Sequence, residues 1–196
     1  MPALKGRTLF FITSPRTPAK MEPEIRLLTD SFSGQTWNQA TQKAFMHALA
    51  NADFFQGRGS GQDMAFSARD RINRGPKALG LVDLSPSIQL TPAGRNFLQS
   101  DSSAETLLRQ LLKFQLPSPY HQQGKSTPIA FCVKPFLEIF RLIRKLGTLR
   151  FDELMIFGMQ LTSYRKFDAI VKKIQTFRAA LAQHPSTSPK RVSLYL

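Results

Sequence analysis

The stretch from Phe66 to Leu98 constrains the fold most, because its local signals change from helix to hairpin to helix within one short segment. Ser67 is a typical N-cap residue, and Asp70 would then lie in the first helical turn, where its charge suits the helix dipole. Gly75-Pro76 should interrupt this helix, because proline has no amide hydrogen for an inner turn. We therefore expect one basic helix from Ser67 to Lys77.

Two short strands are expected next, over residues 81–84 and 88–90, with Ser85-Pro86-Ser87 as the turn between them. Thr91-Pro92 then combines a capping hydroxyl with proline at the first helical position, which indicates a helix start. Helix, hairpin and helix is the order of a winged helix, in which the first helix is usually offered to the DNA major groove. A helix with several cations is equally compatible with an ordinary solvated face.

The composition favours a folded protein with a polyanionic partner. Hydrophobic residues make up 42% of the 196 residues, enough for a packed core. Lys and Arg number 27 against 13 acidic residues, a net charge of +14, which favours DNA, RNA or an acidic membrane surface. No apolar run approaches the roughly 18 residues of a spanning helix, and residues 9–12 are too few for a signal-peptide core. We therefore expect a cytoplasmic protein without a membrane partner.

The remaining signals predict a mainly α chain with a small β-hairpin, an α+β class. Before the central stretch we expect a buried strand at residues 8–13, a helix at 23–28 and a helix capped by Thr36 and Gln39. After it, Ser102 and Glu105 predict another cap. Further helices are expected at residues 135–146, ended by Gly147, and at 151–158 and 167–182, together resembling a helix-turn-helix bundle.

A polar, proline-containing segment from residue 117 to about 128 is the best domain boundary. We expect a winged-helix DNA-recognition subdomain over residues 1–116, a helical, helix-turn-helix-like subdomain over 117–183, and a linker or tail over 184–196. The second half is the more basic, with 13 basic and 4 acidic residues from 117 to 196.

No set of catalytic residues is recognisable. His47, His121 and His184 lie far apart, and none has the spacing of a metal ligand. Cys132 is the one cysteine, so neither an internal disulfide nor a cysteine-based zinc site is possible within the chain. The carboxylates lack the acid-x-lysine step of a Mg²⁺ nuclease. Binding without chemistry is the better interpretation, and no cofactor is expected in this chain.

Five segments, taken together and in this order, resemble the N-terminal part of the AlwI-type family of type IIS restriction and nicking endonucleases. They are Ser14–Pro18, Phe66–Arg71, Leu90–Arg95, Leu111–Ser118 and Ile174–Arg178, and the resemblance runs over most of residues 8–182. It implies two winged-helix or helix-turn-helix subdomains that read a short, asymmetric duplex site, most simply as a monomer. It also implies a separate Mg²⁺-dependent nuclease domain, which this chain is not expected to contain, so cleavage is not carried over.

The expected DNA contacts are Arg16, Ser67, Arg69, Asp70, Arg71, Arg74, Lys77, Arg95, Tyr164, Arg165 and Lys166. Arg69 and Arg71 are the expected readers of guanine, through paired contacts to its O6 and N7 atoms. Asp70 would either accept from a cytosine amino group or cap its helix and orient an arginine.

The other cations are expected to set position more than to read sequence. Arg74, Lys77 and Arg95 would contact phosphates, and Arg16, on a stiff two-proline loop, would contact either phosphate or base. The segment 164–166 precedes a helix and could meet the backbone or a base edge. For each of these, an ordinary surface cation is the alternative.

A stand-alone winged-helix transcriptional regulator is the main rival. A dimer on a palindromic site would favour the regulator, whereas a monomer on an asymmetric site would favour the hypothesis of a restriction endonuclease. An RNA-binding protein is less well supported, because the aromatic residues follow helical stripes instead of a sheet face.

Overall fold

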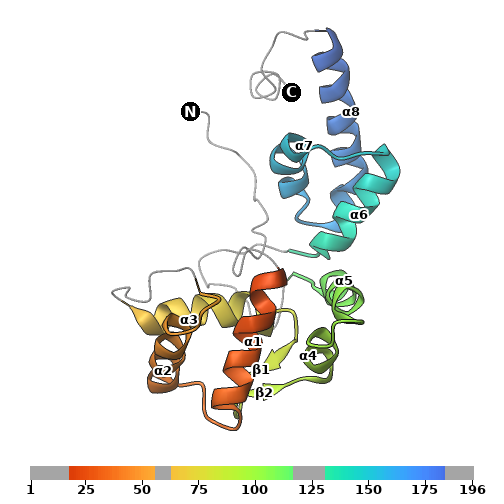
Figure 1. Ribbon diagram of the computed structural model, residues 1–196. Coiled ribbons are helices and arrows are strands. Elements are labelled where there is room, and N and C mark those ends of the chain that lie inside the picture. Colours follow the sequence, from red (N-terminus) through yellow and green to blue (C-terminus); the bar gives the residue numbers. More distant parts are fainter. Residues whose placement is uncertain (1–17, 56–62, 117–130, 184–196) are drawn as a thin grey trace. The chain divides into compact units, whose positions relative to one another are not determined.

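The computed structural model describes residues 18–55, 63–116 and 131–183, and these form two compact units (Figure 1). The N-terminal unit ends at Leu111 and the C-terminal unit begins at Leu112. The described residues are mainly helical, with one two-stranded antiparallel sheet, which confirms the expected mainly α class with a hairpin. Among the described residues, no helix has both the length and the apolar character needed to cross a membrane.

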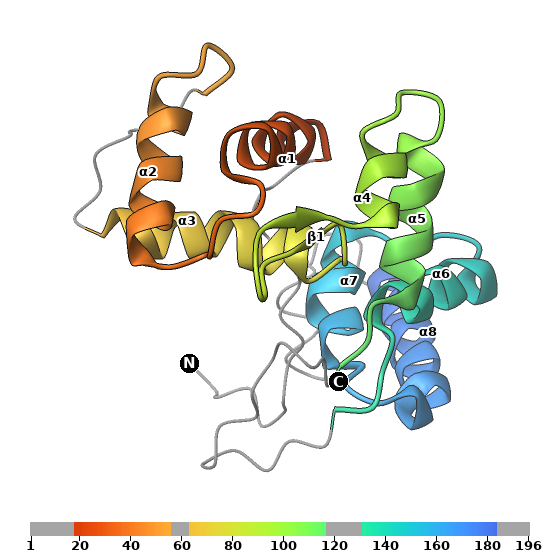
Figure 2. The same cartoon turned by 90° about the horizontal axis from the view of Figure 1, so that it is seen from below.

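The N-terminal unit is built from helices around a small hairpin. In both views α1 lies between α2 and α4 (Figures 1 and 2), and α2 packs against α3. Ile25, Phe45 and Ile72 are among its fully buried side chains, one from each of the first three helices. Its helices are α1 (Pro18–Phe32), α2 (Gln39–Ala50), α3 (Met64–Ile72), the π-helical turn η1 (Asn73–Lys77), α4 (Pro92–Phe97) and α5 (Ser103–Lys113).

The hairpin and the helix after it follow the local signals closely. Strand β1 (Val82–Asp83) pairs with β2 (Gln89–Leu90), with Val82 opposite Leu90. Helix α4 begins after Thr91, whose Oγ1 accepts the Gly94 amide at 2.9 Å, so the predicted cap is confirmed. Helix α4 lies so close to the hairpin that a Cβ on Gly94 would come within 2.0 Å of the Leu81 carbonyl oxygen.

Two predictions in this unit are wrong. Helix α1 extends over Pro18–Phe32, well beyond the expected residues 23–28. Asn38, and not the Thr36–Gln39 pair, caps α2, because its Oδ1 accepts the Thr41 amide at 3.0 Å. Ser102 directly precedes α5, the position that the predicted cap requires, and its hydroxyl donates to the Asn96 carbonyl at 2.7 Å. The expected strand at residues 8–13 lies outside the described residues.

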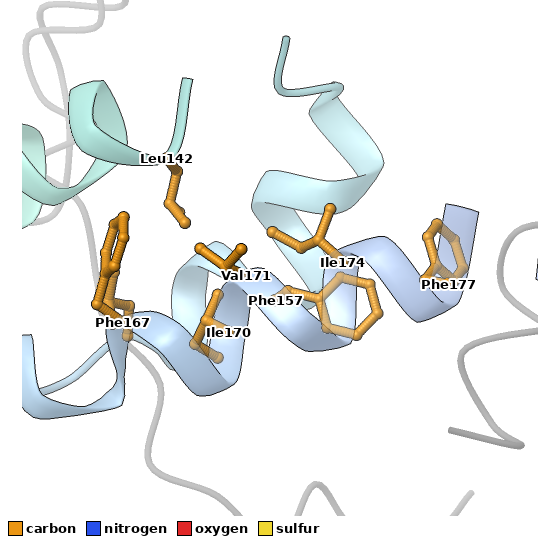
Figure 3. Close-up of a cluster of buried hydrophobic side chains, with 8 residues drawn as sticks. Leu142, Phe157, Phe167, Ile170, Val171, Ile174 and Phe177 are labelled. Atoms are coloured by element: carbon orange, nitrogen blue, oxygen red, sulfur yellow. The ribbon is translucent and has the colours of Figure 1, made fainter. Parts of the chain in front are cut away.

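The C-terminal unit contains α6 (Pro135–Leu146), α7 (Phe151–Ile156) and α8 (Phe167–Gln183), with single 3₁₀ turns η2 (Gly158–Gln160) and η3 (Tyr164–Lys166) between α7 and α8. The three helices and the end of α6 at Gly147, which has φ +76°, are as predicted. Figure 3 shows the apolar stripe of α8 gathered with Leu142 of α6 and with Phe157, the residue after α7. The buried stripe residues are Phe167, Ile170, Val171, Ile174 and Phe177.

Candidate nucleic-acid interface

Helix α3 begins earlier than the sequence signals indicated. Asp63 is the N-cap, and its Oδ1 accepts the Phe66 amide at 2.8 Å. Ser67 therefore lies inside the helix, where its hydroxyl donates to the Asp63 carbonyl at 3.1 Å. The predicted N-cap at Ser67 is therefore wrong. Asp70 falls in the last turn of α3 and not the first, so the argument from the helix dipole is wrong as well. A carboxylate placed three residues before Phe66 accepts the orphan amides of the first turn instead.

The Gly75-Pro76 interruption takes the form of a π-helical turn. Residues Asn73–Lys77 continue directly from α3 with a wider turn, which accommodates a proline that cannot donate. Asn73 is held by the Trp37 indole, whose Nε1 donates to Asn73 Oδ1 at 3.1 Å. Lys77 is half-buried at the end of this turn. The basic helix is thus fixed at both ends by side chains of the same unit.

Two of the expected base readers are engaged within the protein. Arg71 Nη1 lies 2.6 Å from Glu24 Oε1 on α1, and the Arg71 guanidinium stacks 4.9 Å from the Phe55 ring centroid. Only 28% of the Arg71 side chain is exposed. Arg69 donates from Nη1 to Gln42 Oε1 at 2.8 Å and lies 4.0 Å from Asp63. Arg71 therefore ties α3 to α1, whereas Arg69 contacts the buried Gln42 amide of α2 and the exposed Asp63.

The outward face of α3 presents a different set of side chains. Arg74 Nε lies 2.8 Å from Asp70 Oδ1, and 60% of the Arg74 side chain is exposed. Phe66 is exposed one turn before Asp70, on the same face of the helix. Arg95 lies after the hairpin and donates from Nη1 to the Leu90 carbonyl at 3.0 Å. Arg16 lies outside the described residues.

In the C-terminal unit, the segment before α8 is anchored by backbone hydrogen bonds. The Cys132 amide donates to the Thr162 carbonyl at 3.1 Å, and the Tyr164 amide donates to the Cys132 carbonyl at 3.0 Å. Tyr164 and Arg165 are both exposed, and Arg165 Nε donates to the Tyr164 hydroxyl at 3.4 Å. Lys166 Nζ donates to Thr162 Oγ1 at 2.9 Å. The three predicted residues lie together on a fixed turn of backbone.

A buried ion pair joins α7 to α8. Glu153 is fully buried and accepts Arg178 Nε at 2.7 Å and Nη2 at 2.8 Å. Arg178 also donates to the carbonyls of Leu146 and Thr148, so one side chain joins α8 to the end of α6 and the start of α7. Burial favours a higher pKa for Glu153, but the hydrogen bonds from Arg178 and from the Arg150 amide hold that pKa below its ordinary value.

The sequence singled out Arg178 only through the family resemblance, and it did not indicate Glu153 as its partner. The signal that points to this pair is a carboxylate in the first turn of one helix and an arginine on the polar side of the next. Within the described ranges, no group of three or more His, Cys, Asp or Glu side chains is placed to hold a metal ion.

Fold and surface together describe a basic, mainly helical protein of two units, each with exposed arginines at or near the start of a helix. The family model of the AlwI restriction endonuclease matches residues 77–194, more than half of the chain. The chain therefore belongs to the AlwI restriction endonuclease family, which places it in restriction-modification with DNA as the substrate of the family. No curated protein matches the chain significantly.

The extent of the match corrects the resemblance in one respect. The match lies in the C-terminal part of this chain, so it includes Leu90–Arg95, Leu111–Ser118 and Ile174–Arg178 but not Ser14–Pro18 or Phe66–Arg71. The family is thus confirmed from residue 77 onwards, whereas the likeness of α3 to the family stays an inference from sequence.

Proposed function

We propose that this chain is the DNA-recognition part of a type IIS restriction or nicking endonuclease, and that it binds a short asymmetric duplex site as a monomer. Family membership supports DNA as the partner. The order of α3, hairpin and α4 supports a winged-helix arrangement with α3 in the major groove. The three successive helices α6, α7 and α8 support a second, helix-turn-helix-like contact in the C-terminal unit.

The observation that carries this proposal is the charge at the start of α8. Arg165 and Lys166 directly precede the first turn of α8, where the positive end of the helix dipole opposes cations by about 0.3–1 kcal/mol each. Neither side chain has a carboxylate within 4.0 Å among the described residues. Asp168 in the first turn of α8 offsets part of this repulsion, and an anionic partner would relieve the rest. A DNA phosphate is such an anion, and DNA is the substrate of the family.

Among the predicted readers on α3, the contacts favour different roles for Arg69 and Arg71. If Arg71 left Glu24, a buried carboxylate would lose its partner, at a cost of about 3–5 kcal/mol. We therefore assign Arg71 to holding α3 in place. Arg69 donates to the Gln42 amide and lies 4.0 Å from the exposed Asp63, so its release would leave no buried charge unpaired, and we propose it as the guanine reader. Asp70, Arg74, Lys77 and Arg95 keep their proposed contacts to cytosine or phosphate.

We also propose that DNA binding needs no Mg²⁺. The described residues bring no carboxylate cluster together for a metal, and Asp70 is the one carboxylate among the proposed contacts. Binding is accordingly expected to persist in EDTA with the same preference for sequence.

The experiment that tests the function is a selection of bound fragments from a random duplex pool with the full chain. The expected result is one short, asymmetric consensus. A palindromic consensus bound by a dimer would favour a transcriptional regulator instead, and the absence of any enriched sequence would contradict sequence-specific binding altogether.

Arg74 and Arg109 provide a matched pair of variants for this site. Both are exposed arginines, 60% and 69% by side chain, and both pair with an acid one turn earlier in a helix of the same unit. Arg74→Ala should weaken binding to all duplexes and lower the slope of log K against log salt by about one. Arg109→Ala removes the same charge and should leave both quantities unchanged.

A further inference from the structure

Phe66 is an apolar side chain that the fold does not use. It is 54% exposed, although Ala65, Ala68 and Ile72 of the same helix are buried. The backbone amide of Phe66 is satisfied by Asp63, so the helix start needs nothing from the ring. Single exposed apolar side chains are common on protein surfaces, so what distinguishes Phe66 is its position on the same helix face as Asp70 and Arg74.

The neighbours of Phe66 indicate what kind of partner would contact this face of α3. One and two turns further along the same face lie Asp70 and Arg74, and Arg69 lies beside them. The face therefore combines one apolar ring with polar groups and a net positive charge. An apolar patch on a partner protein would be matched by apolar neighbours, but Phe66 is the only large apolar side chain exposed on α3.

The floor of the DNA major groove has this combination of properties. It is anionic at its edges, carries donors and acceptors on the bases, and is apolar only at the C5-methyl groups of thymine, which phenylalanine contacts in known readout. We propose that Phe66 contacts a thymine methyl group and so specifies one A·T pair beside the pairs read by polar side chains of α3. This inference rests on the proposed function and adds a specificity-determining residue to it.

The test removes the methyl group alone. In the duplex consensus obtained with the full chain, each thymine is replaced in turn by deoxyuridine, and the dissociation constant is measured for wild type and for Phe66→Ala. Wild type should lose about fourfold in affinity at one position, the value for one buried methyl-sized group. Phe66→Ala should bind the thymine and deoxyuridine duplexes equally at that position and keep its preferences elsewhere.

Phe54→Ala is the matched control, because Phe54 is another exposed phenylalanine of the same unit, at 45%. It should retain the sensitivity to deoxyuridine, and unfolding curves should show both variants folded. The inference is overturned if no thymine is sensitive, if Phe66→Ala keeps the sensitivity, or if Phe66→Ala binds all duplexes like wild type, as a protein-docking residue would. A chain that selects no consensus at all would instead overturn the proposed function.

Discussion

At the scale of single residues, two buried carboxylates behave in opposite ways. Glu153 accepts from Arg178 and from the Arg150 amide, and these bonds lower its pKa despite burial. Glu24 has only the Arg71 contact at one oxygen, and its Oε2 is buried with no hydrogen-bond partner among the described residues. Burial therefore dominates at Glu24 and raises its pKa above the ordinary value of 4.5, against the charges of Arg71 and Lys20.

The first prediction concerns Arg178. Arg178→Ala leaves Glu153 buried and without its main partner, so the free energy of unfolding should fall by about 3–5 kcal/mol. Urea denaturation measures this loss. Arg109→Ala, which removes an exposed arginine, should change the free energy of unfolding by less than about 0.5 kcal/mol. A loss at Arg178 as small as at Arg109 would show that the Glu153 pair does not hold the C-terminal unit together.

The second prediction concerns pH and Glu24. Because the folded-state pKa of Glu24 is raised, its contribution to stability is fully present below the ordinary value of 4.5 and is lost as pH rises through the folded pKa. Glu24→Gln removes this loss while its amide oxygen still accepts from Arg71. The variant should therefore gain in stability relative to wild type as pH rises above the ordinary value of 4.5, as measured by urea denaturation. If Glu24→Gln instead became less stable relative to wild type as pH rises, pairing with Arg71 would outweigh burial at Glu24.

At the scale of elements, signals that act over a few residues were predictable from sequence. The Thr91 cap, the turn between β1 and β2 and the end of α6 at Gly147 depend on neighbours in the chain, and all three are confirmed. The long apolar stripe of α8 was equally clear, because it repeats over four turns.

Contacts between distant residues were not predictable in this way. Arg71 and Glu24 are 47 positions apart, so the sequence shows two charges but not that they meet. The start of α3 was missed because Asp63 and Ser67 can each cap a helix, and the sequence alone does not show that Asp63 is the one that accepts the Phe66 amide. For the candidate interface, the sequence therefore indicated candidate side chains, whereas packing decides which of them are engaged within the protein, as Arg71 is with Glu24.

The third prediction concerns η3, the turn directly before α8. Cys132 is exposed and is the only cysteine of the chain, and its backbone is hydrogen-bonded to Tyr164. Bound DNA should therefore slow alkylation of Cys132, as measured by mass spectrometry against time. Arg165→Ala should weaken binding and reduce the protection at a fixed DNA concentration, whereas Lys145→Ala on α6 should not. Equal alkylation rates with and without saturating DNA would contradict the proposal that the start of α8 contacts DNA.

At the scale of the whole molecule, the excess of 27 basic over 13 acidic residues makes non-specific binding to any polyanion expected. Affinity for DNA by itself is thus weak support for a recognition protein. Phosphate contacts are shared by all duplexes, and only base contacts distinguish one sequence from another. The central claim is accordingly about preference and not about affinity.

The most direct test of that claim is the ratio of two dissociation constants, for the selected duplex and for a duplex of the same length and composition with scrambled sequence. Both are measured with the full chain at about 150 mM salt in EDTA. The account predicts binding to the selected duplex at least about 10³-fold tighter than to the scrambled one. A ratio near one would contradict it, however tightly both duplexes bind.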